Sequence, residues 1–343
     1  MTLSVAAPAH PRKSTEFAEL SRRIKSAGLL DRRHGYYAAK IGFNLLMLGG
    51  AAVAFAFIGN SWWQLFIAAF LAVIFGQLAF IGHDAGHKQI FRGKRVNDVI
   101  GFMHGGLVGL SYGMWLKQHN SHHANPNHEG KDPDLEIPAL AFTSSQASTK
   151  QGVLRWMAKY QAFLFFPLLL LEGLSLRINS AKAILRGDVK LRRVEAALLI
   201  THIAGYLTVL FLVLSPGIAV LFIVVHQCLW GVYMGCSFAP NHKGMPTMTK
   251  ADSLDFMRKQ ILTARNVRGG RVVDFALGGL NYQIEHHLFP TMPRANLRHA
   301  QRIVSSFCAE RGISYSESGL FRSYGHVLSY LHSLGAPLRA KTA

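Results

Sequence analysis

Two long stretches of the sequence contain no charged residue. Residues 41–82 and 196–241 have no Lys, Arg, Asp or Glu and are rich in Leu, Ile, Phe, Val and Ala. A helix needs about 20 apolar residues to cross the hydrocarbon core of a bilayer, so each stretch is long enough for two crossings. The sequence therefore predicts two transmembrane helical hairpins.

A short turn signal divides each stretch into two spans. Gly-Asn-Ser interrupts the first and Ser-Pro-Gly the second, and these residues are typical of turns. Trp62 and Trp63 follow the first turn, where aromatic residues mark a membrane interface. The fold class expected is an all-α integral membrane protein with a cytoplasmic helical cap. Its spans lie at about 41–58, 62–81, 196–214 and 218–236.

The remaining residues are strongly basic. The chain carries 37 Lys and Arg against 18 Asp and Glu, a net charge of +19, and every cation lies outside the two apolar stretches. Positive charge flanks spans on the cytoplasmic side, so we expect both termini in the cytoplasm of a multi-pass protein of the bacterial cell membrane. We expect the cations to contact membrane lipids. Since the chain is so apolar, nucleic acid is not an expected partner.

One domain is expected between two tails. Residues 1–30 are predicted to be a flexible basic cytoplasmic tail, 31–325 the domain, and 326–343 a C-terminal tail. The run 160–174 is apolar but short. If it crossed the membrane, the histidines before and after it would lie on opposite sides, so we predict that it is interfacial. Residues 295–310 have the pattern of an amphipathic helix.

Histidines gather in four short motifs. WLKQHNSHH spaces three of them at i, i+3 and i+4, which places them on one face of a helix. HDAGH holds a pair at i and i+4, QIEHH holds an adjacent pair, and NHKG holds one more. The eight residues are His83, His87, His119, His122, His123, His242, His286 and His287.

This number of histidines predicts two metal ions. A single zinc site uses three or four protein ligands, and neutral imidazole is the commonest metal ligand. All-imidazole coordination suits iron, copper or zinc. HDAGH lacks the Glu of HExxH, which disfavours a zinc protease.

Acidic neighbours are candidates for orienting the imidazoles. Metal-bound imidazoles usually donate their second N–H to a carboxylate or carbonyl. Asp84 adjoins His83 and Glu285 adjoins His286, so both are expected to act in this way. Asp132 and Asp134 are expected to be turn and cap residues, and His128 is expected to be structural.

HDAGH, HNSHH and QIEHHLFP, in this order around two apolar hairpins, resemble the three histidine boxes of the membrane fatty acid desaturases. The third box begins with Gln283, as in the subgroup of acyl-CoA and acyl-lipid desaturases that includes front-end enzymes. A cytochrome b5 domain, fused to many members, has no HPGG counterpart in this chain.

The resemblance implies an oxygen-dependent oxidoreductase that introduces a cis double bond into a fatty acyl chain. It implies two iron ions held by the eight histidines, with Gln283 as a weak ligand or a neighbour of the ligands. O2 is the implied co-substrate, and no catalytic residue is expected beyond the metal ligands. Electrons would come from an external ferredoxin-type carrier and its reductase, since the chain has no CxxC or GxGxxG.

Other functions share some of these features. A di-iron lipid hydroxylase or a sphingolipid desaturase would carry the same boxes. A membrane metal transporter would need ionisable residues along its spans, where only His202 and His226 occur. We expect these two to make hydrogen-bonded contacts between helices or to lie near the path of the acyl chain.

Overall fold

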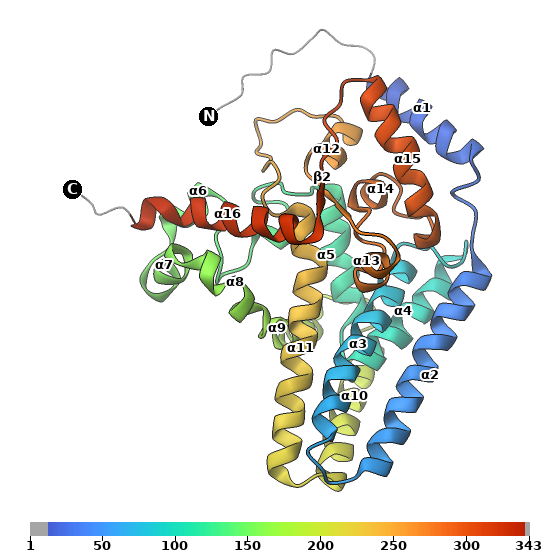
Figure 1. Cartoon of the computed structure of the whole chain (residues 1–343), viewed down its shortest axis with the longest axis vertical. Helices are drawn as coiled ribbons and strands as arrows, with labels where there is room; N and C mark the ends of the chain where they lie inside the picture. Colours follow the sequence, from blue (N-terminus) through green and yellow to red (C-terminus); the bar gives the residue numbers. More distant parts are fainter. Residues whose placement is uncertain (1–12, 340–343) are drawn as a thin grey trace.

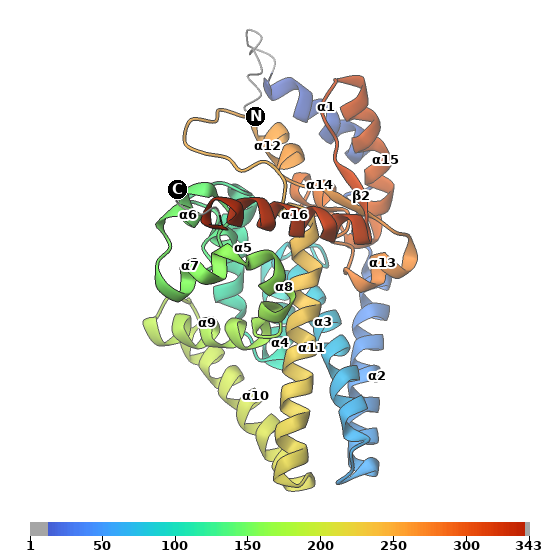
Figure 2. The same ribbon diagram turned by 60° about the vertical axis from the view of Figure 1, so that its left-hand side comes forward.

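Four long helices run along the long axis of the molecule (Figure 1). In the computed structural model, which describes residues 13–339, these four helices are long and apolar enough to cross a membrane. They are α2 (His34–Ile58), α3 (Gln64–Gly86), α10 (Arg192–Val213) and α11 (Pro216–His242). Short turns join α2 to α3 and α10 to α11 at the same end of the molecule (Figures 1 and 2). The two predicted hairpins are confirmed.

The hairpins pack through small residues inside and leave apolar side chains outside. A Cβ on Gly76 of α3 would lie 2.2 Å from the Tyr233 ring of α11, so glycine permits the close approach of these two helices. On the outer faces, Phe57 and Leu212 are 89% and 80% exposed. Large exposed apolar side chains on every hairpin are typical of helices that face lipid tails.

Two helices continue beyond their predicted ends. The predicted spans end at residues 81 and 236, whereas α3 runs to Gly86 and α11 to His242. The polar residues in these extra turns have buried partners. Asp84 pairs with Arg294, and the Asn241 amide donates to the Leu280 carbonyl at 2.7 Å. The helices therefore carry histidines out of the apolar region without a break.

The other elements lie away from the hairpin turns (Figures 1 and 2). The two strands, β1 (Asn266–Arg268) and β2 (Glu317–Gly319), form a parallel pair with Val267 opposite Ser318. The remaining helices are α1 (Lys13–Ser26), α4 (Lys94–Val108), α5 (Tyr112–Ala124), the 3-10 helix η1 (Pro133–Leu135), α6 (Ser144–Thr149), α7 (Gly152–Lys159), α8 (Gln161–Leu169), α9 (Glu172–Arg186), α12 (Phe256–Leu262), α13 (Arg271–Ala276), α14 (Gln283–Leu288), α15 (Arg294–Glu310) and α16 (Leu320–Arg339).

The segments predicted as tails contain packed helices where the structure describes them. Residues 13–26 form α1, and its Leu20 and Ile24 are buried in one cluster with Phe307 of α15. At the other end, α16 runs to Arg339 and buries Val327 and Leu331. These apolar side chains give each terminal helix a packed face. Residues 1–12 and 340–343 lie outside the described part. The amphipathic helix predicted at 295–310 is confirmed as α15.

The apolar run 160–174 is split between two helices. α8 has nine residues, which make about 13.5 Å of helix, less than half of the roughly 30 Å hydrocarbon core. The axis bends by 71° between α8 and α9. Neither the bend nor the length requires a crossing, and the interfacial assignment stays a prediction.

Cysteine labelling tests the side of the membrane on which these helices lie. In a variant without Cys228, Cys236 and Cys308, we expect cysteines at Ser148 and Arg186, both exposed, to react with an impermeant thiol reagent only from the cytoplasmic side. A cysteine at Gly217, in the second hairpin turn, should react only from outside. Labelling of Ser148→Cys and Arg186→Cys from opposite sides would overturn the predicted topology.

Candidate metal centre

Four separate parts of the chain bring the predicted histidines together. The end of α3 supplies His83, and His87 caps that helix. The end of α11 supplies His242. The helix α5 carries the i, i+3, i+4 triplet, and the short helix α14 carries the adjacent pair of the third motif. The prediction that these motifs meet is confirmed.

The histidines form two groups, each compact enough to hold one metal ion. The ligand atoms within each group all lie within 4.8 Å of one another. The first group is His83, His87, His119 and His286. The second group is His122, His242 and His287.

His123 lies between the two groups. Its Nε2 is 3.1 Å from the Nε2 of His119, in the first group. Its ring stacks on His287, in the second group, with the centroids 4.2 Å apart. His123 can therefore contribute to either group, and the two groups share one buried space.

Hydrogen bonds to Nδ1 orient four of the imidazoles. His83 Nδ1 lies 3.1 Å from Asp84 Oδ1, and His122 Nδ1 lies 3.0 Å from both carboxylate oxygens of Asp132. His242 Nδ1 lies 2.9 Å from the Thr263 carbonyl, and His287 Nδ1 lies 2.8 Å from Gln260 Oε1. An imidazole that donates through Nδ1 keeps the Nε2 lone pair for a metal.

The inward nitrogens fit a metal site. His83 Nε2, His287 Nε2 and both ring nitrogens of His286 are buried without a hydrogen-bond partner. An unsatisfied buried polar atom costs about 1–3 kcal/mol, and a metal ion would supply the missing partner. The donor set is imidazole, which suits iron, copper or zinc.

Most of these imidazoles are neutral at pH 7. Of the six that lie outside the long helices α3 and α11, burial lowers the pKa of five well below the ordinary value, and the neighbouring imidazoles lower the pKa further. These are His87, His119, His123, His286 and His287. Metals bind the neutral ring, so the ligand lone pairs are free without a change in pH.

His122 differs from the others because carboxylates surround its Nδ1. Burial lowers the pKa of His122, but the charges of Asp134 and Asp132 outweigh this effect and leave the pKa raised. The partner Asp132 has its pKa lowered to about 2 by the hydrogen bond and charge of His122, against the effect of burial. Asp132 is thus ionised and accepts from His122.

Of the predicted neighbours of the ligands, two contact histidines. Asp84 contacts His83, as predicted. Gln283 places Nε2 2.9 Å from His242 Nε2 and accepts from Asn241 through Oε1 at 3.0 Å.

Glu285 differs from the prediction. Its carboxylate accepts from Asn266 at 2.7 Å and from Tyr315 at 2.8 Å instead of from His286. Both of its oxygens are therefore held by residues outside the histidine groups. Burial raises its pKa to about 7, and the two hydrogen bonds oppose that shift.

Sequence reasoning missed three residues that orient ligands. Asp132 is the expected cap of η1, accepting from the Asp134 amide at 3.0 Å, but it also binds His122. Gln260 and Thr263 come from α12 and the turn after it. Only the frequent pairing of metal-bound histidines with carboxylates could have pointed to Asp132.

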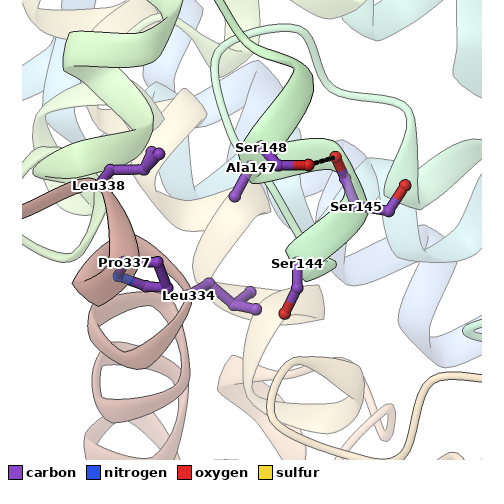
Figure 3. A pocket seen from close by; sticks show the side chains of 7 residues that line it. All are labelled: Ser144, Ser145, Ala147, Ser148, Leu334, Pro337 and Leu338. Carbon is purple, nitrogen blue, oxygen red and sulfur yellow. Dashed lines mark hydrogen bonds between the residues drawn. The ribbon is translucent and has the colours of Figure 1, made fainter. Parts of the chain in front are cut away.

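Other histidines and one cavity lie away from the two groups. His128 pairs with the Glu129 carbonyl at 2.8 Å and belongs to neither group. In the spans, His226 contacts the Tyr206 hydroxyl at 2.9 Å, as expected for a contact between helices. A cavity of about 390 Å³ lies between α6 and α16, lined by serine, alanine, leucine and proline (Figure 3). It contains no metal-binding side chain.

Comparisons with known proteins agree with this site. The family model for fatty acid desaturases matches residues 60–319. The chain is 30% identical to the Delta(5) fatty acid desaturase fat-4 of Caenorhabditis elegans, over 94% of this chain and 74% of that protein. It is 28% identical to the Delta(6)-fatty-acid desaturase fat-3 of the same organism, over 98% and 78%. A Delta 8-(E)-sphingolipid desaturase of Emericella nidulans is 30% identical, over 88% and 58%.

The chain belongs to the fatty acid desaturase family. It is a membrane-bound oxidoreductase, a fatty acid desaturase, as the resemblance of its histidine motifs implies.

Replacing His122 and, in a second variant, His128 distinguishes a metal ligand from a structural histidine. We expect His122→Ala to lose at least half of the bound metal and all desaturation while the protein stays in the membrane, because the spans do not depend on this residue. His128→Ala should keep both metal and activity, because His128 belongs to neither group. Elemental analysis of purified protein measures the metal. Full metal content in His122→Ala would contradict the assignment.

Proposed function

We propose that the chain uses two iron ions, one in each histidine group, to desaturate a fatty acyl chain with O2. The observation that carries this proposal is the convergence of seven histidines into two compact groups, with His123 between them. An unactivated methylene C–H bond cannot be broken by positioned acids and bases alone. Bound iron would supply the oxygen chemistry, and the protein would position the acyl chain.

The chain's own residues hold the proposed ligands. Asp84, Asp132, Gln260 and the Thr263 carbonyl fix the orientation of four imidazoles. Burial keeps most of the rings neutral and limits the access of water. Trp115 stacks on His119 with the centroids 4.6 Å apart and so holds that ring from the α5 side.

The proposed substrate is an acyl chain dissolved in the membrane. The apolar hairpins place the histidine groups directly beyond the spans, where an acyl chain in the bilayer can reach them. The similar proteins named as Delta(5) and Delta(6) fatty acid desaturases support this substrate class. The sphingolipid desaturase of Emericella nidulans makes a sphingolipid acyl chain the second candidate.

Product analysis tests the proposal. Expressed in a host without desaturases, together with an electron donor, the chain should produce fatty acids with a new cis double bond, located by mass spectrometry. His122→Ala, present at the same level in the membrane, is the control and should give none. Hydroxylated fatty acids as the main product would instead favour a hydroxylase. A double bond confined to sphingolipids would favour the second candidate.

We infer that electrons come from an external, acidic carrier of the ferredoxin type, together with its reductase. Desaturation with O2 needs two electrons from outside. We expect the carrier to dock on the basic residues that follow the first histidine motif and precede the third. The exposed members are Lys88, Arg92, Lys94, Arg95, Arg268 and Arg271.

Arg265 also precedes the third histidine motif in the sequence, but it does not belong to this surface. Arg265 is buried and donates to the Pro240 carbonyl at 2.6 Å and to the Lys243 carbonyl at 3.0 Å. It holds the end of α11 in place. Lys94 is exposed but pairs with Asp98, so Arg92 and Arg95 are better positions for a test.

The salt dependence of the reaction tests this docking surface. In neutral-lipid membranes, we expect the KM for an acidic ferredoxin to rise with ionic strength, because salt screens charges over a Debye length of about 8 Å at 0.15 M. Arg92→Glu with Arg95→Glu should raise KM at low salt. Arg155→Glu with Lys182→Glu, exposed on α7 and α9, is the control. An unchanged KM in the first variant would exclude this surface.

A further inference from the structure

Arg294 is a buried arginine that contacts the first histidine group through an acid. It is the first residue of α15, and its side chain is buried. Its Nε donates to Asp84 Oδ2 at 2.8 Å, and its Nη2 lies 2.6 Å from the same oxygen. Nη2 also donates to the Phe80 carbonyl at 2.6 Å. The guanidinium therefore binds the last turns of α3 at two residues, Asp84 and Phe80.

The other oxygen of Asp84 reaches a proposed ligand. Asp84 Oδ1 lies 3.1 Å from His83 Nδ1. Arg294, Asp84 and His83 thus form a continuous buried chain of contacts that joins α15 to the last turn of α3. Asp84 is buried and its Oδ2 is held by the Arg294 guanidinium, so the position of Asp84 depends on Arg294.

Arg294 is itself fixed on both sides. Its backbone amide lies 3.1 Å from Gln89 Oε1 and 3.2 Å from the Tyr37 hydroxyl. A Cβ on Gly279, whose φ is +78°, would lie 2.4 Å from Arg294 Cγ. Only glycine leaves room there for the arginine methylenes. The loop before the third histidine motif is therefore shaped around this side chain.

The acid of the second group is held differently. Asp132 contacts His122 and accepts from the backbone amides of Asn127 at 2.7 Å and Asp134 at 3.0 Å. The carboxylate of Asp132 is therefore held by backbone amides of its own loop. The support of Asp84 comes from an arginine that is 210 residues away in the sequence.

The geometry points to Arg294 as a positioning residue of the first metal group. It holds Asp84, and Asp84 fixes the Nδ1 side of His83 so that Nε2 faces the metal. This inference rests on the proposed di-iron function. A planar guanidinium can contact Asp84 and the Phe80 carbonyl together, whereas an ammonium group cannot reproduce that fork.

Iron retention tests the inference. Wild type, Arg294→Gln and Arg294→Lys are purified in detergent, loaded with iron, and titrated with a chelator. We expect Arg294→Gln to release one of its two irons at lower chelator strength, with about 10–100-fold as the upper bound, since that is the usual cost of losing the residue that contacts the ligand itself. The other iron should be released as in wild type. Arg294→Lys should lie between the two.

Two further variants separate this role from general destabilisation. Arg298→Gln removes another arginine of α15, one that pairs with Asp274 nearer the surface, and should keep both irons. Asp132→Asn should weaken the other iron, so combining it with Arg294→Gln should weaken both. Mössbauer spectra of 57Fe-loaded protein follow the two irons separately. If the purified Arg294→Gln protein is not monodisperse, the iron retention of Arg294→Lys, measured with the same controls, tests the inference instead.

Retention of both irons at wild-type chelator strength in the Arg294 variants would overturn the inference. The inference would also be overturned if the Arg294 variants released both irons at equally reduced chelator strength and Asp132→Asn did the same. A wild-type protein that holds no iron and makes no double bond would instead remove the proposed function. The two failures are therefore distinguishable.

Discussion

The convergence of eight imidazoles, six of them buried, constrains the whole arrangement. Each ring has two nitrogens, and a buried nitrogen without a partner is unfavourable. The protein satisfies the outer nitrogens of His83, His122, His242 and His287 from elements far apart in the chain. The possible ligand atoms of each group then lie within 4.8 Å of one another, so that each group could hold one metal ion. The loops, the short helices and the cap can be understood as the means of bringing these partners to the rings.

The membrane helices take part directly in this arrangement. Because α3 and α11 continue unbroken into the site, His83 and His242 are rigidly tied to the spans. The position of the histidine groups relative to the spans is therefore set by helix geometry and not by a flexible linker. A substrate held in the bilayer meets a site at fixed height, which is what a reaction at one chosen carbon of an acyl chain requires.

The sequence predicts the parts of this structure that have a local signal. Uncharged stretches reveal the four spans, and helical spacing reveals the ligand face of α5. It does not reveal partners that meet only through folding. Arg294 and Gln260 lie far in the sequence from the residues they hold, and no periodicity marks such pairs. The prediction for Glu285 failed for the opposite reason. Glu285 is next to His286 in the sequence, but its carboxylate binds Asn266 and Tyr315 instead. The buried faces of α1 and α16 are too short to stand out within basic segments.

The most direct test is a structure of the iron-loaded protein with the metals located by anomalous scattering at the iron edge. The account predicts two iron peaks, one bounded by His83, His87, His119 and His286 and the other by His122, His242 and His287, with His123 adjacent to both. A single peak, or iron bound away from these two groups in protein that desaturates, would contradict it.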